Sequence, residues 1–72
     1  MGKVELEGLI LGFLRATGPQ ELCDIRSYCQ RNSRHLVTRT AVHSALRDLA
    51  ADGQVRQEAS PDATPYWSIS NA

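Results

Sequence analysis

Three side chains suited to binding phosphate recur at a fixed interval near the middle of the 72-residue chain. Arg39, His43 and Arg47 are spaced i, i+4 and i+8, so on an α-helix they form a single row. Guanidinium and imidazole groups donate hydrogen bonds to phosphate oxygens, and Thr40 and Ser44 beside the row add hydroxyl donors. The simpler interpretation of such a row is a solvated helix face. The pattern therefore offers two hypotheses, a surface for an anionic ligand and an ordinary solvent-facing surface.

The sequence predicts a helix over residues 38–52, closed by Gly53, that would carry this row. Thr38 is a good N-cap, because its hydroxyl can accept a hydrogen bond from a free amide of the first turn. Gly53 suits the left-handed conformation that closes a helix. Apolar residues between them repeat at i, i+3, i+4 and i+7, which is typical of a buried helix face. These residues are Val42, Ala45, Leu46 and Leu49.

Charge is strongly segregated along the chain although the net charge is zero. Residues 26–47 carry five arginines and no acid, whereas residues 1–25 carry four acids and two bases, and residues 48–72 four acids and one base. Zero net charge argues against a strongly electrostatic nucleic-acid binder. A cationic middle segment, which includes Arg34, is still compatible with local phosphate contacts.

Two further helices are expected before this one, over residues 4–16 and 20–31. The sequence Thr-Gly-Pro separates them, with Pro19 in the first turn of the second helix. In the second helix Arg26, Gln30 and Arg31 are expected to face outward. A linking turn over residues 33–37 follows, with Leu36 and Val37 directed inward. The expected core comprises Leu9, Ile10, Phe13, Leu14, Leu22, Ile25, Val42, Leu46, Leu49 and Ile69.

The pattern changes to that of strands after Gly53. Strands are predicted over residues 54–59 and 66–70, joined by a polar, proline-bounded loop that makes them a hairpin. Three helices followed by a two-stranded β-hairpin wing predict an α+β fold, the winged helix-turn-helix, as a single domain over residues 1–72. In helix-turn-helix proteins the second helix of the motif enters the major groove of DNA. Here that helix is the one over residues 38–52.

Neither an enzyme nor a metal protein is indicated. The chain shows no paired carboxylates, no nucleophile with a base and no glycine-rich phosphate loop, and it implies no cofactor. Cys23 and Cys29 are six residues apart on one predicted helix, so their side chains diverge and cannot pair. Together with His35 and His43 they lack the spacing of a zinc site. Two reduced thiols, at least one in the core, are typical of an intracellular protein.

Membrane association is not expected either, since no apolar run approaches the length of about 18 residues that a spanning helix needs. The N-terminus also lacks the pattern of a signal peptide. We therefore expect an intracellular protein, in the cytoplasm or the nucleus.

The C-terminal half resembles one family of winged helices. Residues 46–59 read Leu-Arg-Asp-Leu-Ala-Ala-Asp-Gly-Gln-Val-Arg-Gln-Glu-Ala, and residues 64–69 read Thr-Pro-Tyr-Trp-Ser-Ile. This is similar to the Zα domains, winged helices that bind left-handed Z-DNA and Z-RNA. In that family the recognition helix leads into a glycine, a strand, a short loop and a proline followed by a tryptophan. Pro65 and Trp67 stand in the last two places.

The resemblance also implies roles for the cationic row. Arg39 and Arg47 stand where the family places phosphate contacts. His43 and Arg47 replace an asparagine and, four residues on, a tyrosine that stacks on a base and packs on the tryptophan. Arg47 is expected to lay its guanidinium on Trp67 and reach a phosphate, and His43 to donate to one. The predicted nucleic-acid-binding residues are thus Arg34, Arg39, Thr40, His43, Ser44, Arg47, Pro65 and Trp67.

Three functions remain open at this point. The main hypothesis is binding of double-stranded DNA, in preference to RNA, in transcriptional regulation. The alternatives are Zα-like binding of Z-DNA or Z-RNA, and a protein-interaction winged helix without a nucleic-acid ligand, which the zero net charge favours. Homodimerisation stays an open possibility, since many winged-helix regulators pair through terminal helices.

Overall fold

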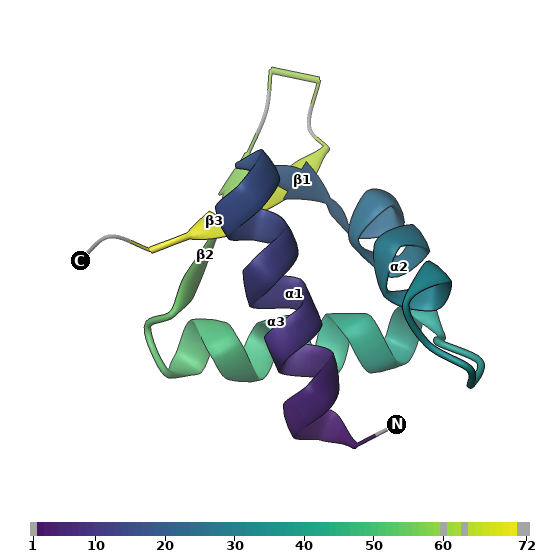
Figure 1. The fold of residues 1–72 in the computed structure, drawn as a ribbon. Helices are drawn as coiled ribbons and strands as arrows, with labels where there is room; N and C mark the ends of the chain where they lie inside the picture. Colours follow the sequence, from purple (N-terminus) through teal and green to yellow (C-terminus); the bar gives the residue numbers. More distant parts are fainter. Residues whose placement is uncertain (1, 60, 63, 71–72) are drawn as a thin grey trace.

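The computed structural model describes residues 2–59, 61–62 and 64–70, and within them the chain forms three helices and three short strands (Figure 1). Their order is α1 (Lys3–Thr17), β1 (Gln20–Glu21), α2 (Leu22–Arg31), α3 (Arg39–Ala51), β2 (Val55–Ala59) and β3 (Pro65–Ile69). Figure 1 shows α1 crossing α3, with α2 beside them and the sheet at the C-terminal end of α1. The predicted α+β winged helix-turn-helix is confirmed.

The sheet contains a strand that the sequence did not reveal. Its order is β1-β3-β2, all antiparallel, with Gln20 opposite Trp67 and Glu21 opposite Tyr66. Placing Pro19 in the first turn of the second helix was therefore wrong, because the chain is extended at residues 20–21 and the helix begins at Leu22. Residues 20–21 are extended because they form backbone hydrogen bonds with the edge of β3, which exists only once the hairpin has folded. Proline is tolerated just before such an edge strand.

The core is formed mainly by the expected apolar faces. Six of the ten predicted residues are buried, and the other four, Leu9, Phe13, Leu22 and Ile69, are partly buried and packed against them. A domain of this size has too little interior to cover every apolar side chain completely. The buried set also includes Leu6, Cys29, Val37, Ala45, Val55 and Trp67.

Side chains of α2 hold the linker that precedes α3. The Gln30 amide donates to the carbonyl oxygen of His35 at 3.0 Å and accepts from the Val37 amide at 2.8 Å. The Arg26 guanidinium donates to the Val37 carbonyl oxygen at 3.1 Å. The expectation that Arg26 and Gln30 face outward was wrong, because the linker's backbone groups need partners and these long polar side chains reach them.

Leu36 was also misplaced by the sequence analysis. It is 83% exposed, whereas its neighbour Val37 is 4% exposed. In an extended linker successive side chains point to opposite sides, so only one of the two can enter the core. Val37 takes that position because Arg26 and Gln30 bind its backbone.

The two cysteines occupy different environments. Cys23 is exposed and Cys29 is buried, and both are free thiols. Burial raises the pKa of the Cys29 thiol to about 11, because a thiolate there would lose its hydration. The expectation of at least one thiol in the core is confirmed. Among the described residues no helix is long and apolar enough to cross a membrane.

Truncation of Leu46 tests the placement of the core. Leu46 on α3 is 0% exposed, so Leu46→Ala should lower the free energy of unfolding by about 2–5 kcal/mol, the usual cost of such a cavity. Urea denaturation followed by circular dichroism measures this. Leu36→Ala is the matched control, since its side chain is exposed and its loss should cost about 0.5 kcal/mol or less. Equal effects of the two substitutions would contradict the assignment of the core.

Candidate nucleic-acid interface

The candidate interface is built on α3, and residues next to this helix determine where it begins and ends. The Thr38 hydroxyl accepts a hydrogen bond from the Ala41 amide at 3.1 Å, as expected of an N-cap. Beyond the helix Gly53 adopts φ 77°, the left-handed conformation that residues with a side chain rarely adopt. The helix therefore runs from Arg39 to Ala51, within the predicted bounds.

Burial of one face of α3 orients the cationic row outward. Val42 and Leu46 are 0% exposed and Leu49 is 1% exposed, so the apolar stripe faces the core. Arg39, His43 and Arg47 are exposed, together with Thr40 and Ser44. The helical phase predicted from the sequence is confirmed, and the row lies on the side of α3 that a ligand can reach.

Four of the predicted site residues line one hollow on this exposed face, which we call the α3 hollow. They are Thr40, His43, Ser44 and Arg47, joined by Asp48 and Ala51. The sequence analysis missed Asp48 and Ala51. Their i+4 spacing from Ser44 and Arg47 is the signal that places them on the same side of the helix.

Asp48 brings a carboxylate to the edge of this otherwise basic and neutral hollow. Its side chain forms a salt bridge with Lys3 of α1. The hydrogen bond and the charge of Asp48 raise the pKa of Lys3, so this lysine stays protonated at neutral pH. The ammonium group offsets the negative charge of Asp48 next to Arg47. The pair also ties the start of α1 to the exposed side of α3.

Trp67 packs against α3 through His43. The indole is 4% exposed, and its ring centroid lies 6.2 Å from that of His43 with the ring planes at 81°, an edge-to-face contact. Arg47 was expected to lie on Trp67, but the ring contact that the structure shows is one helical turn earlier. The position of β3 decides this, because it brings Trp67, in the middle of the strand, beside His43, the middle residue of the exposed row. Trp67 is therefore both part of the core and a neighbour of the α3 hollow.

The remaining predicted residues lie outside the α3 hollow. Arg34, in the linker, lines a separate hollow with Glu5 and His35, so the structure does not join it to the α3 row. Pro65 is exposed at the start of β3, opposite Ala59. The hairpin register also sets Gln57, an exposed amide, opposite Trp67. The sequence analysis missed Gln57, because its pairing follows only from the register.

Taken together, the side chains on this face are suited to binding phosphate. It offers two guanidinium groups, one imidazole and two hydroxyls as hydrogen-bond donors, and its one carboxylate is paired. Within the described part of the chain no group of three or more His, Cys, Asp or Glu side chains lies close enough to hold a metal ion. The chemistry available is anion recognition through charge-assisted hydrogen bonds.

Comparison with solved structures identifies the fold. The apo Zα domain of zebrafish PKZ superposes with a TM-score of 0.82 at 23% identity, covering 96% of this chain and 97% of that one. The Zα domain of PKZ from Carassius auratus, in complex with Z-DNA, gives 0.75 at 22% identity, covering 93% and 95%.

A structure of the DNA recognition and protein interaction domains of HOP2 gives 0.71 at 23% identity, covering 89% of this chain and 97% of that one. This chain has the fold of a Zα domain. No protein-family model matches the sequence, and no curated protein was found as a relative.

A double-mutant cycle tests the contact between His43 and Trp67. Edge-to-face aromatic pairs contribute about 0.5–1.5 kcal/mol beyond their buried area. The stability losses of His43→Ala and Trp67→Leu, measured by urea denaturation, should therefore be non-additive. The control cycle pairs Trp67→Leu with Arg39→Ala one turn away, whose effects should add to within about 0.5 kcal/mol. Additivity in both cycles would mean that Trp67 does not pack on His43.

Proposed function

We propose that this chain is a winged-helix nucleic-acid-binding domain that binds a left-handed Z-form duplex through α3 and the hairpin. The observation that carries the proposal is the contact of Trp67 with His43. It puts the indole directly beside the exposed row of phosphate-binding side chains on α3. The fold shared with Zα domains, one of them in complex with Z-DNA, supports the left-handed form.

The α3 row suits a backbone-directed mode of binding. Contacts to phosphate and sugar fix the position of a protein on a duplex and respond to its shape without reading its bases. Arg39, His43 and Arg47 present cationic or neutral donors at one-turn intervals, and Thr40 and Ser44 add short donors between them. A Z-form duplex differs from the right-handed form chiefly in the path of its phosphates, so a rigid row of donors on one helix can select it.

His43 and Arg47 would take over the positions of an asparagine and a tyrosine in the Zα family. The imidazole of His43, oriented by Trp67, donates to a phosphate as an amide does. The Arg47 guanidinium is planar and stacks on aromatic faces, so it can lie against a base while its N–H groups bond a phosphate. Arg47 is exposed, which leaves it free to adopt this position.

Ordinary right-handed DNA, as bound by a transcriptional regulator, is the less favoured ligand. A helix that inserts into the major groove of such DNA usually carries further cations around it. Here Arg34 lies apart from the α3 hollow, and Arg56 of the hairpin is paired with Glu58. We propose DNA as the ligand to test first, and RNA of the same repeat as the comparison.

Circular dichroism of an alternating CG duplex tests the proposed function. Stoichiometric protein should invert the long-wavelength bands of the DNA spectrum, because the left-handed form has the opposite sign there. Arg39→Ala and Arg47→Ala should weaken the conversion, and Arg31→Ala, at the exposed end of α2, should not. Binding without inversion would assign the domain to right-handed duplexes. Absence of binding to any duplex at low salt would point to a protein partner instead.

Salt dependence of binding tests the number of phosphate contacts. The logarithm of the affinity should fall with the logarithm of the salt concentration by roughly 0.9 per phosphate contacted on a duplex. The two arginines and His43 of the α3 row offer about two to three such contacts. Arg39→Ala should reduce the slope by about one unit, and Arg31→Ala should leave it unchanged. A slope near zero for the unmodified protein would contradict binding through the α3 row.

A further inference from the structure

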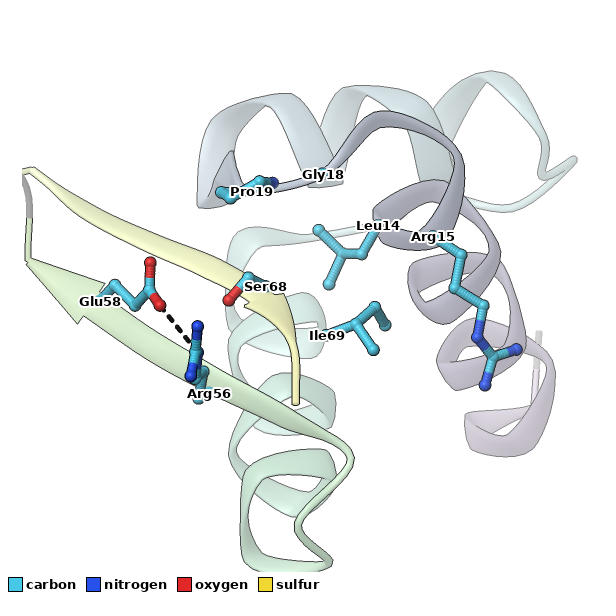
Figure 2. Close-up of a pocket in the computed structure, with 8 residues that line it drawn as sticks. All are labelled: Leu14, Arg15, Gly18, Pro19, Arg56, Glu58, Ser68 and Ile69. Atoms are coloured by element: carbon cyan, nitrogen blue, oxygen red, sulfur yellow. Dashed lines mark ion pairs between the residues drawn. The ribbon is translucent and has the colours of Figure 1, made fainter. Parts of the chain in front are cut away.

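A second cleft lies between the C-terminal end of α1 and the β2–β3 hairpin (Figure 2). Its cavity volume is about 370 Å³. We call it the outer cleft, and it is lined by Leu14, Arg15, Gly18, Pro19, Arg56, Glu58, Ser68 and Ile69. None of these residues belongs to the α3 hollow.

The register of the hairpin separates the outer cleft from the surface on α3. Side chains directly opposite each other in neighbouring strands share a face, and successive side chains alternate. Arg56 pairs with Ser68, and Gln57 pairs with Trp67. Arg56 and Ser68 therefore lie on one face of the hairpin, and Trp67, which contacts His43 of α3, lies on the other.

The hydroxyl of Ser68 is the feature in this cleft that folding alone does not explain. Ser68 is 6% exposed, and its hydroxyl oxygen has no hydrogen-bond partner among the described residues. Burying an unpaired hydroxyl destabilises a protein, and buried polar groups in native structures are nearly always paired. Figure 2 shows the oxygen turned toward the side of the cleft that carries Arg56. The position calls for a partner that the described chain does not supply.

The carboxylate of Glu58 already occupies the side of the outer cleft that carries Arg56. Glu58 forms a salt bridge with the Arg56 guanidinium, with 2.7 Å between nitrogen and oxygen. The two side chains are 61% and 42% exposed, and exposed ion pairs contribute little to stability, so this one opens easily. On the other side of Leu14 and Ile69 lies Arg15, which has no ion pair within the described part of the chain.

We propose that the outer cleft binds an acidic side chain of a partner peptide, with an apolar neighbour of that side chain against Leu14 and Ile69. The incoming carboxylate replaces Glu58 as the partner of Arg56, and the movement of the pair exposes the Ser68 hydroxyl, which donates to the same carboxylate. Glu58 thus acts as an internal competitor that the peptide displaces. Arg15 adds attraction from the far side of the cleft.

The charges around the cleft favour a peptide over a nucleic acid. A nucleic-acid backbone would require several free cations at phosphate spacing. Here Arg56 is paired. Glu58 and Glu21 place two carboxylates on the same face of the sheet, since each lies directly opposite Tyr66 in a neighbouring strand. The effect of Glu21 is visible in Tyr66, whose pKa its negative charge raises. A single carboxylate beside an apolar group fits these surroundings, and a run of phosphates does not.

Two capped dipeptides serve as probes of the full chain. Acetyl-leucyl-aspartyl amide carries the carboxylate, and acetyl-leucyl-asparaginyl amide is its uncharged counterpart. In a nuclear magnetic resonance titration the acidic probe should give saturable amide shifts in residues 14–18 and at Arg56, Glu58, Ser68 and Ile69, with millimolar affinity. The uncharged probe should bind at least about tenfold more weakly, as expected for loss of a charged hydrogen bond. Equal binding of the two probes, or shifts confined to α3, would overturn the proposal.

Substitutions within the outer cleft test the roles of Glu58 and Arg56 in binding. Glu58→Gln should strengthen binding of the acidic probe about two- to fivefold by freeing Arg56 from an exposed ion pair. Arg56→Gln should weaken it about tenfold or more, whereas Arg31→Gln, outside the cleft, should leave it unchanged. Weaker binding by Glu58→Gln would refute the role of Glu58 as a competitor and with it the proposed site.

Ser68→Ala and a duplex titration complete the test. Removing the unpaired hydroxyl should leave the urea midpoint of the free protein unchanged or raise it, yet weaken binding of the acidic probe. A hydroxyl that were merely structural would lower the midpoint and leave binding intact, contrary to the proposal. Addition of CG duplex should leave the amide signals of residues 14–18, in the part of the outer cleft outside the hairpin, in place. Shifts within the hairpin are expected, because the proposed duplex surface includes it. Displacement of the signals of residues 14–18 by DNA would assign the cleft to nucleic acid and overturn the peptide assignment, whatever the result for α3.

Discussion

Burial of one face of α3 is the constraint on which the rest of the structure depends. Val42, Leu46 and Leu49 are enclosed by α1, α2 and the sheet, and this fixes the rotation of the helix about its axis. Because the helix is rigid, the same packing fixes the opposite row of Arg39, His43 and Arg47 in solvent. Apolar burial, the dominant favourable term in folding, thereby also sets the direction of the polar groups that would meet a ligand. No separate interaction is needed to present them.

Features encoded over a few neighbouring residues could be predicted from the sequence. The start of α3 follows from Thr38, its end from Gly53, and its phase from apolar spacing, since each depends on local backbone chemistry. Features that depend on distant partners could not be predicted. Strand β1 exists because β3 offers an open edge, and the direction of Leu36 depends on α2 side chains that bind the linker.

The same division applies to the candidate site. Thr40, His43, Ser44 and Arg47 come together because they share one helix, so their spacing was sufficient to group them. Arg47 was predicted to be the residue of α3 that packs on Trp67, whereas in the structure this residue is His43. Which turn of α3 lies beside Trp67 depends on the length of the turn after Gly53 and on the strand register. Periodicity gives the direction of a side chain within an element. It does not give the translation of one element along another.

The hairpin connects the two surfaces through alternation of its side chains. Trp67 faces α3 and Ser68 faces the outer cleft, so one strand contributes consecutive residues to both. A slip of one residue in strand pairing would exchange their faces, placing a hydroxyl in the core and an indole in the outer cleft. Burial of Trp67 makes that slip costly, because the large indole would leave the core for the outer face. The tryptophan that supports the α3 surface therefore also holds Ser68 and Arg56 in register on the opposite face.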